Sequence, residues 1–143
     1  MTDRFKLALA TLNPTVGDIP GNLKKIEAAR AEAARLGADL VLTSELATCG
    51  YPPEDLVLKP AFQQALHAAL DKLAAQQGPD ILVSTPFVAD EKVMSSVVLI
   101  SNGKIEAVRH KVDLPNYGPF DEKRVFTAGP LPEPILWRGI KLG

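Results

Sequence analysis

The chain has 143 residues, of which 16 are lysine or arginine and 17 are aspartate or glutamate, so its net charge is −1. This length suits one domain with a substantial core, and the balanced, dispersed charge gives no electrostatic basis for binding nucleic acid or an anionic membrane. Cys49 is the only cysteine, which excludes an internal disulfide and favours a reducing compartment, by default the cytoplasm. Residues 1–10 have too short an apolar run for a signal peptide, and no stretch reaches the ~20 apolar residues of a membrane span.

In the first part of the chain the apolar pattern predicts a strand, a helix and a second strand. Residues 5–11 alternate weakly and indicate a strand. Asn22 is the expected N-cap of a helix over residues 22–36, which Gly37 ends. The apolar run at residues 40–42 follows at once and indicates a buried strand. Because the links are short, the two strands are expected to be parallel, with a right-handed crossover.

The second part of the chain combines one more helix with a strand and a hairpin. The predicted elements are a helix over residues 60–77, a strand over 81–85, and two strands over 93–101 and 104–111. Asn102-Gly103 between the last two is a strong hairpin signal. Since a hairpin is antiparallel, we expect an α/β protein with a mixed sheet. Residues 112–134 look irregular, and residues 135–143 look like one strand and the beginning of another.

Glu45 is the first candidate for chemistry, because it follows the buried strand at residues 40–42 and precedes a Gly-Tyr-Pro-Pro turn at residues 50–53. In open α/β sheets, functional groups gather at the carboxyl ends of strands. Poor solvation there would raise the pKa of Glu45 toward the range in which it can exchange protons near neutral pH. The alternative is that Glu45 caps a turn or pairs with a structural arginine or lysine.

Two separated blocks of sequence resemble one family. The first contains Asn-Pro-Thr-Val-Gly-Asp at residues 13–18, Gly-Asn-Leu at 21–23, and Glu45-Leu46 with Gly-Tyr-Pro-Pro-Glu-Asp-Leu at 50–56. The second is Lys-Val-Asp-Leu-Pro-Asn-Tyr-Gly-Pro-Phe-Asp-Glu-Lys-Arg-Val-Phe at 111–126. Both resemble the N-terminal glutaminase domain of glutamine-dependent NAD+ synthetases. The resemblance, which spans nearly all of residues 1–143, implies a nitrilase-like carbon–nitrogen hydrolase domain with an α-β-β-α sandwich, incomplete in this chain.

That family works with a Glu-Lys-Cys triad, so the resemblance implies roles for particular residues. Glu45 would be the general base, and Lys111 would stabilise the charged intermediate. Glu122 would be the supporting second carboxylate, although its neighbour Asp121 fits the same position. Tyr117 would line the glutamine pocket, or it could simply be a packing residue. Without the motif, Lys111 would read as a strand-terminal lysine in water.

The family's nucleophilic cysteine begins a Cys-Glu-Asp motif that would follow Gly143, so we expect a fragment that is inactive alone. Cys49 lies only four residues after Glu45 and is better explained as a small buried thiol. The family's ATP-dependent synthetase domain is also absent from the sequence. The resemblance therefore implies no metal or cofactor for this domain, with ATP and Mg²⁺ expected only at the synthetase domain. The expected partners are glutamine, the synthetase domain and further copies of the same chain.

Two other functions remain open at this point. One is a stand-alone nitrilase-like amidase acting on another small amide, and the other is a non-catalytic α/β module used in assembly. The assembly module predicts that Glu45 and Lys111 point away from each other or into solvent. The enzyme predicts that their charged groups converge within a few ångströms.

Overall fold

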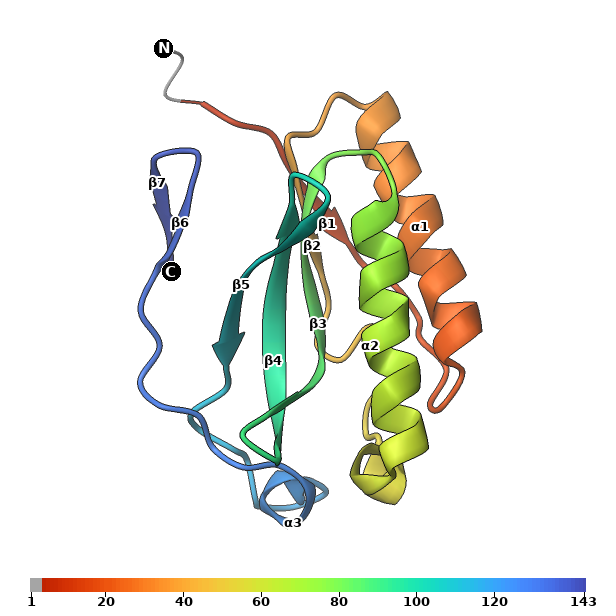
Figure 1. Cartoon of the computed structure of the whole chain (residues 1–143), viewed down its shortest axis with the longest axis vertical. Helices are drawn as coiled ribbons and strands as arrows, with labels where there is room; N and C mark the ends of the chain where they lie inside the picture. Colours follow the sequence, from red (N-terminus) through yellow and green to blue (C-terminus); the bar gives the residue numbers. More distant parts are fainter. Residues whose placement is uncertain (1–3) are drawn as a thin grey trace.

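The computed structural model describes residues 4–143, which form three layers (Figure 1). In chain order the elements are β1 (Leu7–Ala10), α1 (Ile19–Arg35), β2 (Leu40–Thr43), the 3₁₀ turn η1 (Glu54–Leu58), α2 (Pro60–Ala75), β3 (Asp80–Ala89), β4 (Lys92–Ser101), β5 (Lys104–His110), α3 (Glu122–Val125), β6 (Ile135–Trp137) and β7 (Ile140–Leu142). Residues 1–3, part of the segment considered above for a signal peptide, lie outside the described residues. Among the described helices, none is long and apolar enough to cross a membrane.

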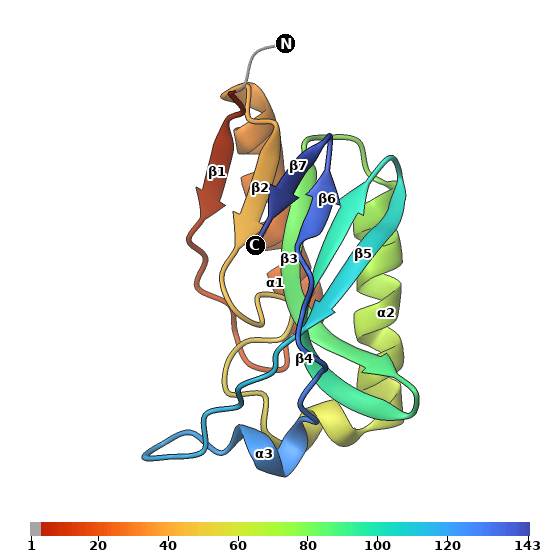
Figure 2. The same ribbon diagram turned by 90° about the vertical axis from the view of Figure 1, so that its left-hand side faces the viewer.

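The main sheet has five strands in the order β1-β2-β3-β4-β5. β1, β2 and β3 are parallel, whereas β3-β4 and β4-β5 are antiparallel, so the predicted mixed sheet is confirmed. Helices α1 and α2 cover one face of this sheet, and the β6-β7 hairpin lies on the other (Figures 1 and 2). These are three layers of the expected α-β-β-α sandwich, with its second sheet represented by two strands.

The core has two parts, one on each face of the sheet. The larger lies under the helices and includes Ile26, Leu70 and Ile81, each at most 1% exposed. The smaller joins Leu40 and Leu99 of the sheet to the β6-β7 hairpin. Burial on both faces explains why β2 reads as a continuous apolar run rather than an alternating one.

The predicted N-cap of the first helix is wrong by four residues. Helix α1 begins at Ile19, and its N-cap is Asp18, whose side chain accepts a hydrogen bond from the amide of Gly21. Asn22 is instead fully buried. Its side chain accepts from the amide of Thr15 at 2.7 Å and donates to the carbonyls of Thr15 and Thr48. The polar residue therefore joins two loops by tertiary contacts, which a local capping pattern does not reveal.

Three further elements differ from the sequence predictions. β3 runs to Ala89 rather than to residue 85, because the antiparallel partner β4 continues the ladder through Pro86. The segment expected to be irregular contains the one-turn helix α3. The last residues form a complete hairpin, β6-β7, turning at Arg138-Gly139, both with positive φ.

Polar contacts of Asp80 fasten this hairpin to the main sheet. The indole N–H of Trp137 donates to Asp80 Oδ2 at 2.7 Å, and the guanidinium of Arg138 donates to the same oxygen at 3.0 Å. The ring of Phe5 meets the indole edge-on at 5.2 Å between ring centroids. Because Asp80 is buried, these donors replace hydrogen bonds that its side chain would otherwise make to water.

We expect Trp137→Phe to lower the free energy of unfolding by about 2 kcal/mol, since it removes a buried hydrogen bond and part of a buried ring. Urea unfolding followed by circular dichroism measures this change. Leu136→Ala is the control, because the side chain of Leu136 points to solvent and is 68% exposed. Equal effects of the two substitutions would contradict a fastening role for Trp137.

Candidate active site

Glu45 lies two residues beyond the end of β2, in a segment that side-chain hydroxyls of β2 and β3 hold in place. The amide of Leu46 donates to Ser84 Oγ at 2.8 Å, and the amide of Ser84 donates to Thr43 Oγ1 at 3.0 Å. Leu46 is fully buried and has a φ of 47°, a left-handed conformation unusual for leucine. Strained backbone of this kind persists only where surrounding contacts over-determine it, so the direction of the Glu45 side chain is set by tertiary structure.

The expectation that Glu45 is poorly solvated is wrong for the chain as described. Its side chain is 48% exposed, because the strand ends at the rim of the sheet and no described element covers the carboxylate. Glu45 pairs with a lysine, as the alternative reading allowed. That lysine is Lys111, the second residue of the predicted triad.

Lys111 follows β5 directly and is held on both sides by backbone hydrogen bonds. Its amide donates to the carbonyl of Ser95 at 2.8 Å, and its carbonyl accepts from the amide of Gly129 at 2.9 Å. The ammonium lies 2.6 Å from Glu45 Oε1 and 3.1 Å from Glu122 Oε1. Glu45 and Lys111, which are 66 positions apart in sequence, therefore converge.

The two carboxylates also determine the ionisation of this lysine. Partial burial alone would lower the pKa of Lys111, but its hydrogen bonds to Glu45 and Glu122 outweigh that effect and raise the pKa above its usual value. A raised lysine pKa means that the ammonium, and the stability it provides, is present at neutral pH and lost only as pH rises through the folded-state pKa. The group is a permanent cation under physiological conditions.

The second carboxylate at Lys111 belongs to Glu122, the first residue of α3, whose side chain is only 4% exposed. Its Oε2 also lies 3.1 Å from the lysine ammonium, although no hydrogen bond to this oxygen is present among the described residues. Asp121, the alternative candidate for the supporting carboxylate, instead accepts a hydrogen bond from Arg124 at 2.8 Å. The geometry thus separates two neighbouring acids that the sequence left equivalent.

Glu45 and Lys111 line a cavity of about 490 Å³ on the side of the sheet that carries the hairpin. The other residues that line it include Ser84, His110, Leu142 and Gly143. The carboxyl end of β7 therefore reaches the same cavity as the acid and the lysine. Arg109 supports one wall, because its guanidinium donates to the carbonyls of Glu133 at 2.6 Å and Pro134 at 3.2 Å.

The remaining predicted residues lie outside this cavity. Tyr117 is 70% exposed, packs edge-on against Phe120, and is not among the residues that line the cavity. Cys49 is fully buried, as expected, and burial raises the pKa of its thiol to about 12. Within residues 4–143, no group of histidine, cysteine and acidic side chains could hold a metal ion.

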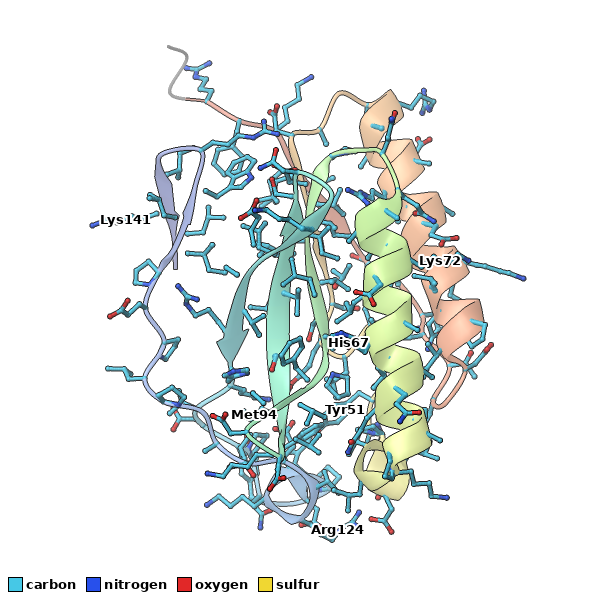
Figure 3. The ribbon with its side chains drawn as sticks, in the orientation of Figure 1. Tyr51, His67, Lys72, Met94, Arg124 and Lys141 are labelled. Carbon is cyan, nitrogen blue, oxygen red and sulfur yellow. The ribbon has the colours of Figure 1, made fainter. Side chains whose placement is uncertain are left out.

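Tyr51 is a residue to which the sequence assigned no role. It belongs to the Gly-Tyr-Pro-Pro turn and lies at the end of the molecule that carries α3, as does Arg124 (Figure 3). Burial and the neighbouring carboxylate of Glu122 raise the pKa of Tyr51 to about 12. The position of the Gly-Tyr-Pro-Pro turn shortly after Glu45 was the available signal in the sequence, but only the fold brings Tyr51 to Glu122.

Cys49 should resist alkylation in the folded protein, because its sulfur is buried and burial raises the pKa of the thiol, which leaves little reactive thiolate near neutral pH. We expect iodoacetamide to leave Cys49 unmodified in native buffer and to modify it fully in urea, as measured by intact-mass spectrometry. Rapid modification of the native protein would show an accessible thiol and would reopen Cys49 as a candidate nucleophile.

The mixed sheet and the Glu-Lys-Glu cluster at its rim together define a nitrilase-like α/β protein with an acid–lysine site. The sequence matches the carbon–nitrogen hydrolase family over residues 6–143, and the chain belongs to that family.

Its relatives include much longer proteins. It is 41% identical to a glutamine-dependent NAD(+) synthetase of Synechocystis and 40% identical to one of Rhodobacter capsulatus, covering 97% and 100% of this chain but 26% of each relative. This chain thus spans about a quarter of the length of these relatives.

Solved structures show the same fold. A glutamine-dependent NAD+ synthetase from Acinetobacter baumannii, in complex with ADP, has a TM-score of 0.90 and 32% identity, covering 96% of this chain and 26% of that one. A variant of an amidase from Nesterenkonia sp. AN1 has a TM-score of 0.81 and 31% identity, covering 96% of this chain and 53% of that one. In that structure the acetamide moiety of fluoroacetamide is covalently added at the active-site cysteine.

Proposed function

We propose that this chain is part of the glutamine-hydrolysing domain of a glutamine-dependent NAD+ synthetase, a carbon–nitrogen ligase with glutamine as amide donor. The ammonia released here would be used elsewhere in the same protein for ATP-dependent amidation of deamido-NAD. The observation that carries the proposal is the ion-paired contact of the Lys111 ammonium with Glu45, which shares its cavity, and with the buried Glu122 beside it. The long NAD+ synthetases that match almost the whole chain support the choice of glutamine.

The proposed chemistry divides between a thiol and these groups. A thiolate attacks the side-chain carbonyl of glutamine, the C–N bond breaks, and water then releases glutamate from the thioester. Glu45 takes the proton of the thiol and gives it to the departing ammonia, and later activates the water. The Lys111 ammonium stabilises the oxyanion of each tetrahedral intermediate. Glu122 holds Lys111 in place from the buried side.

We propose that the thiol is supplied by residues following Gly143 in the whole protein. Leu142 and Gly143 line the cavity that contains Glu45 and Lys111, so this end of β7 lies next to the two charged groups, which supports the proposal. Cys49, by contrast, is fully buried and hydrogen-bonded to the carbonyl of Gly50. The 143-residue chain alone would then release no ammonia from glutamine, and ATP and Mg²⁺ would bind the synthetase part. Association into oligomers and residence in the cytoplasm stay predictions from the sequence.

A stand-alone amidase is the second candidate, because the similar Nesterenkonia amidase shares the fold and has a reactive active-site cysteine. The test uses the purified whole protein that contains this chain. We expect ammonia release from glutamine, and NAD formation from deamido-NAD, ATP and glutamine. Hydrolysis of acetamide or propionamide without NAD formation would instead favour the amidase.

A further inference from the structure

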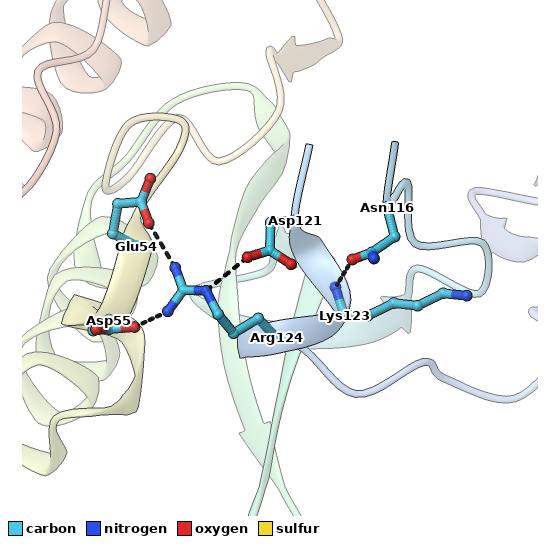
Figure 4. Close-up of polar contacts among 6 residues, drawn as sticks. All are labelled: Glu54, Asp55, Asn116, Asp121, Lys123 and Arg124. Carbon is cyan, nitrogen blue, oxygen red and sulfur yellow. Dashed lines mark hydrogen bonds and ion pairs between the residues drawn. The ribbon is translucent and has the colours of Figure 1, made fainter. Parts of the chain in front are cut away.

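Arg124 forms a cluster of ion pairs outside the cavity (Figure 4). Its guanidinium binds Glu54 at 2.6 Å, Asp121 at 2.8 Å and also Asp55. Glu54 and Asp55 belong to η1, whereas Asp121 is the N-cap of α3. One side chain therefore joins two segments that are about 70 positions apart in sequence.

These two segments carry groups of the candidate site. η1 begins three residues after Tyr51, and α3 begins with Glu122, which contacts Lys111. Both segments pack through Val57 and Val125 into the core beneath α1 and α2. Arg124 closes the same junction from the solvent side.

Neither segment is stable by its own local interactions. α3 has four residues, too few for an independent helix. The side chain of its N-cap residue, Asp121, accepts no hydrogen bond from the backbone amides of the helix. Glu54, at the start of η1, has a φ of 51°, a strained conformation for a residue other than glycine. The place of Glu122 therefore depends on contacts between the two segments.

The charges around Arg124 make this residue different from an ordinary surface arginine. A single exposed ion pair contributes little to stability. Here, however, one cation separates three carboxylates of two segments, so its removal leaves like charges facing each other across the junction. Repulsion would then drive η1 away from α3.

We propose that Arg124 is a positioning residue that clamps η1 to α3 and so holds Glu122 against Lys111. The assignment to glutamine hydrolysis rests on the function proposed above, but the clamp itself is a structural claim. Two kinds of measurement are therefore needed, one of local structure and one of activity.

The structural test is hydrogen–deuterium exchange by mass spectrometry on the whole protein, comparing Arg124→Ala with the parent. We expect amide exchange in residues 51–58 and 116–126 to become about tenfold faster, with α1 and β4 unchanged. Addition of 0.5–1 M NaCl should slow this exchange again, because salt screens the repulsion. Arg35→Ala is the matched control, since Arg35 pairs with Glu32 on the exposed surface of α1. Unchanged exchange in both segments, or a uniform increase throughout the protein, would overturn the clamp.

The charge origin is tested by removing the repulsion as well as the cation. In Arg124→Ala/Glu54→Gln/Asp55→Asn, exchange in residues 116–126 should return most of the way to that of the parent. Arg124→Lys should rescue only partly, because an ammonium cannot contact three carboxylates in the fork geometry of a guanidinium. If exchange in the triple variant is as fast as in Arg124→Ala, the loss of contacts made by Arg124, and not repulsion between the carboxylates, causes the opening. That result would overturn the proposed mechanism.

Activity gives an independent readout. We expect Arg124→Ala to lower kcat for glutamine hydrolysis about tenfold, with partial recovery in high salt, while Arg35→Ala leaves it unchanged. If the parent protein hydrolyses no glutamine, the proposed function fails, yet the exchange experiment still decides the clamp. If the parent is active and Arg124→Ala exchanges faster locally without any loss of kcat, the clamp stands as structure and its link to Glu122 is wrong.

Discussion

Glu45→Gln in the whole protein is expected to lower the rate of glutamine hydrolysis by about 10²–10⁴-fold, the usual contribution of a positioned general base. The amide keeps the shape of the side chain and can still contact Lys111, but it cannot accept the thiol proton. Ammonia release from glutamine, followed with glutamate dehydrogenase under saturating glutamine, measures the change.

Ammonium chloride provides the control for this substitution. If glutamine only supplies ammonia, NAD formation with added ammonium should be the same in the parent and in Glu45→Gln, because the ligase chemistry lies elsewhere. A Glu45→Gln protein that still hydrolyses glutamine within a factor of about three of the parent would remove Glu45 from the proton transfers. Loss of both activities would instead point to a folding defect.

Lys111→Met should destabilise the domain as well as abolish hydrolysis. Glu122 is 4% exposed and Lys111 is the cation that faces it, so the substitution leaves a buried carboxylate without its partner. We expect the free energy of unfolding to fall by about 3 kcal/mol, the lower end of the range for broken buried pairs, because Lys111 itself is 31% exposed. Urea unfolding at pH 7 measures the change.

Two comparison variants test the reason for this loss. Lys111→Met/Glu122→Gln should recover most of the stability, since it removes the uncompensated charge together with its partner. Lys72→Met breaks the looser pair with Glu27, 3.7 Å apart on the surface, and should cost less than about 1 kcal/mol. Equal losses in Lys111→Met and Lys72→Met would show that burial of Glu122 has no energetic consequence.

The sequence predicted the secondary structure correctly where turn residues and short connections between elements decide it. The Asn102-Gly103 turn predicted the β4-β5 hairpin, and the short links around α1 predicted parallel β1 and β2. The N-cap of α1 was misplaced, because Asn22 has the chemistry of a cap but is engaged with Thr15 and Thr48 from other loops. The β6-β7 hairpin was only half recognised, since it depends on Asp80 of β3 for its anchoring.

For the site, the sequence by itself determined which residue types were available: an acid after β2, a lysine after β5 and a pair of acids in a family-like motif. Only the tertiary structure decided that Glu45 and Lys111 meet at 2.6 Å, that Glu122 and not Asp121 contacts Lys111, and that Tyr51 and Arg124 lie at the same end of the molecule. The physical reason is that the Lys111 contact with Glu45 and the Arg124 contact with Asp55 join positions 66 and 69 residues apart, while the contact of Lys111 with Glu122 depends on the path of the irregular segment between them. Their geometry follows from strand order, from the strained turn at Leu46 and from charge pairing across loops, none of which a local pattern encodes.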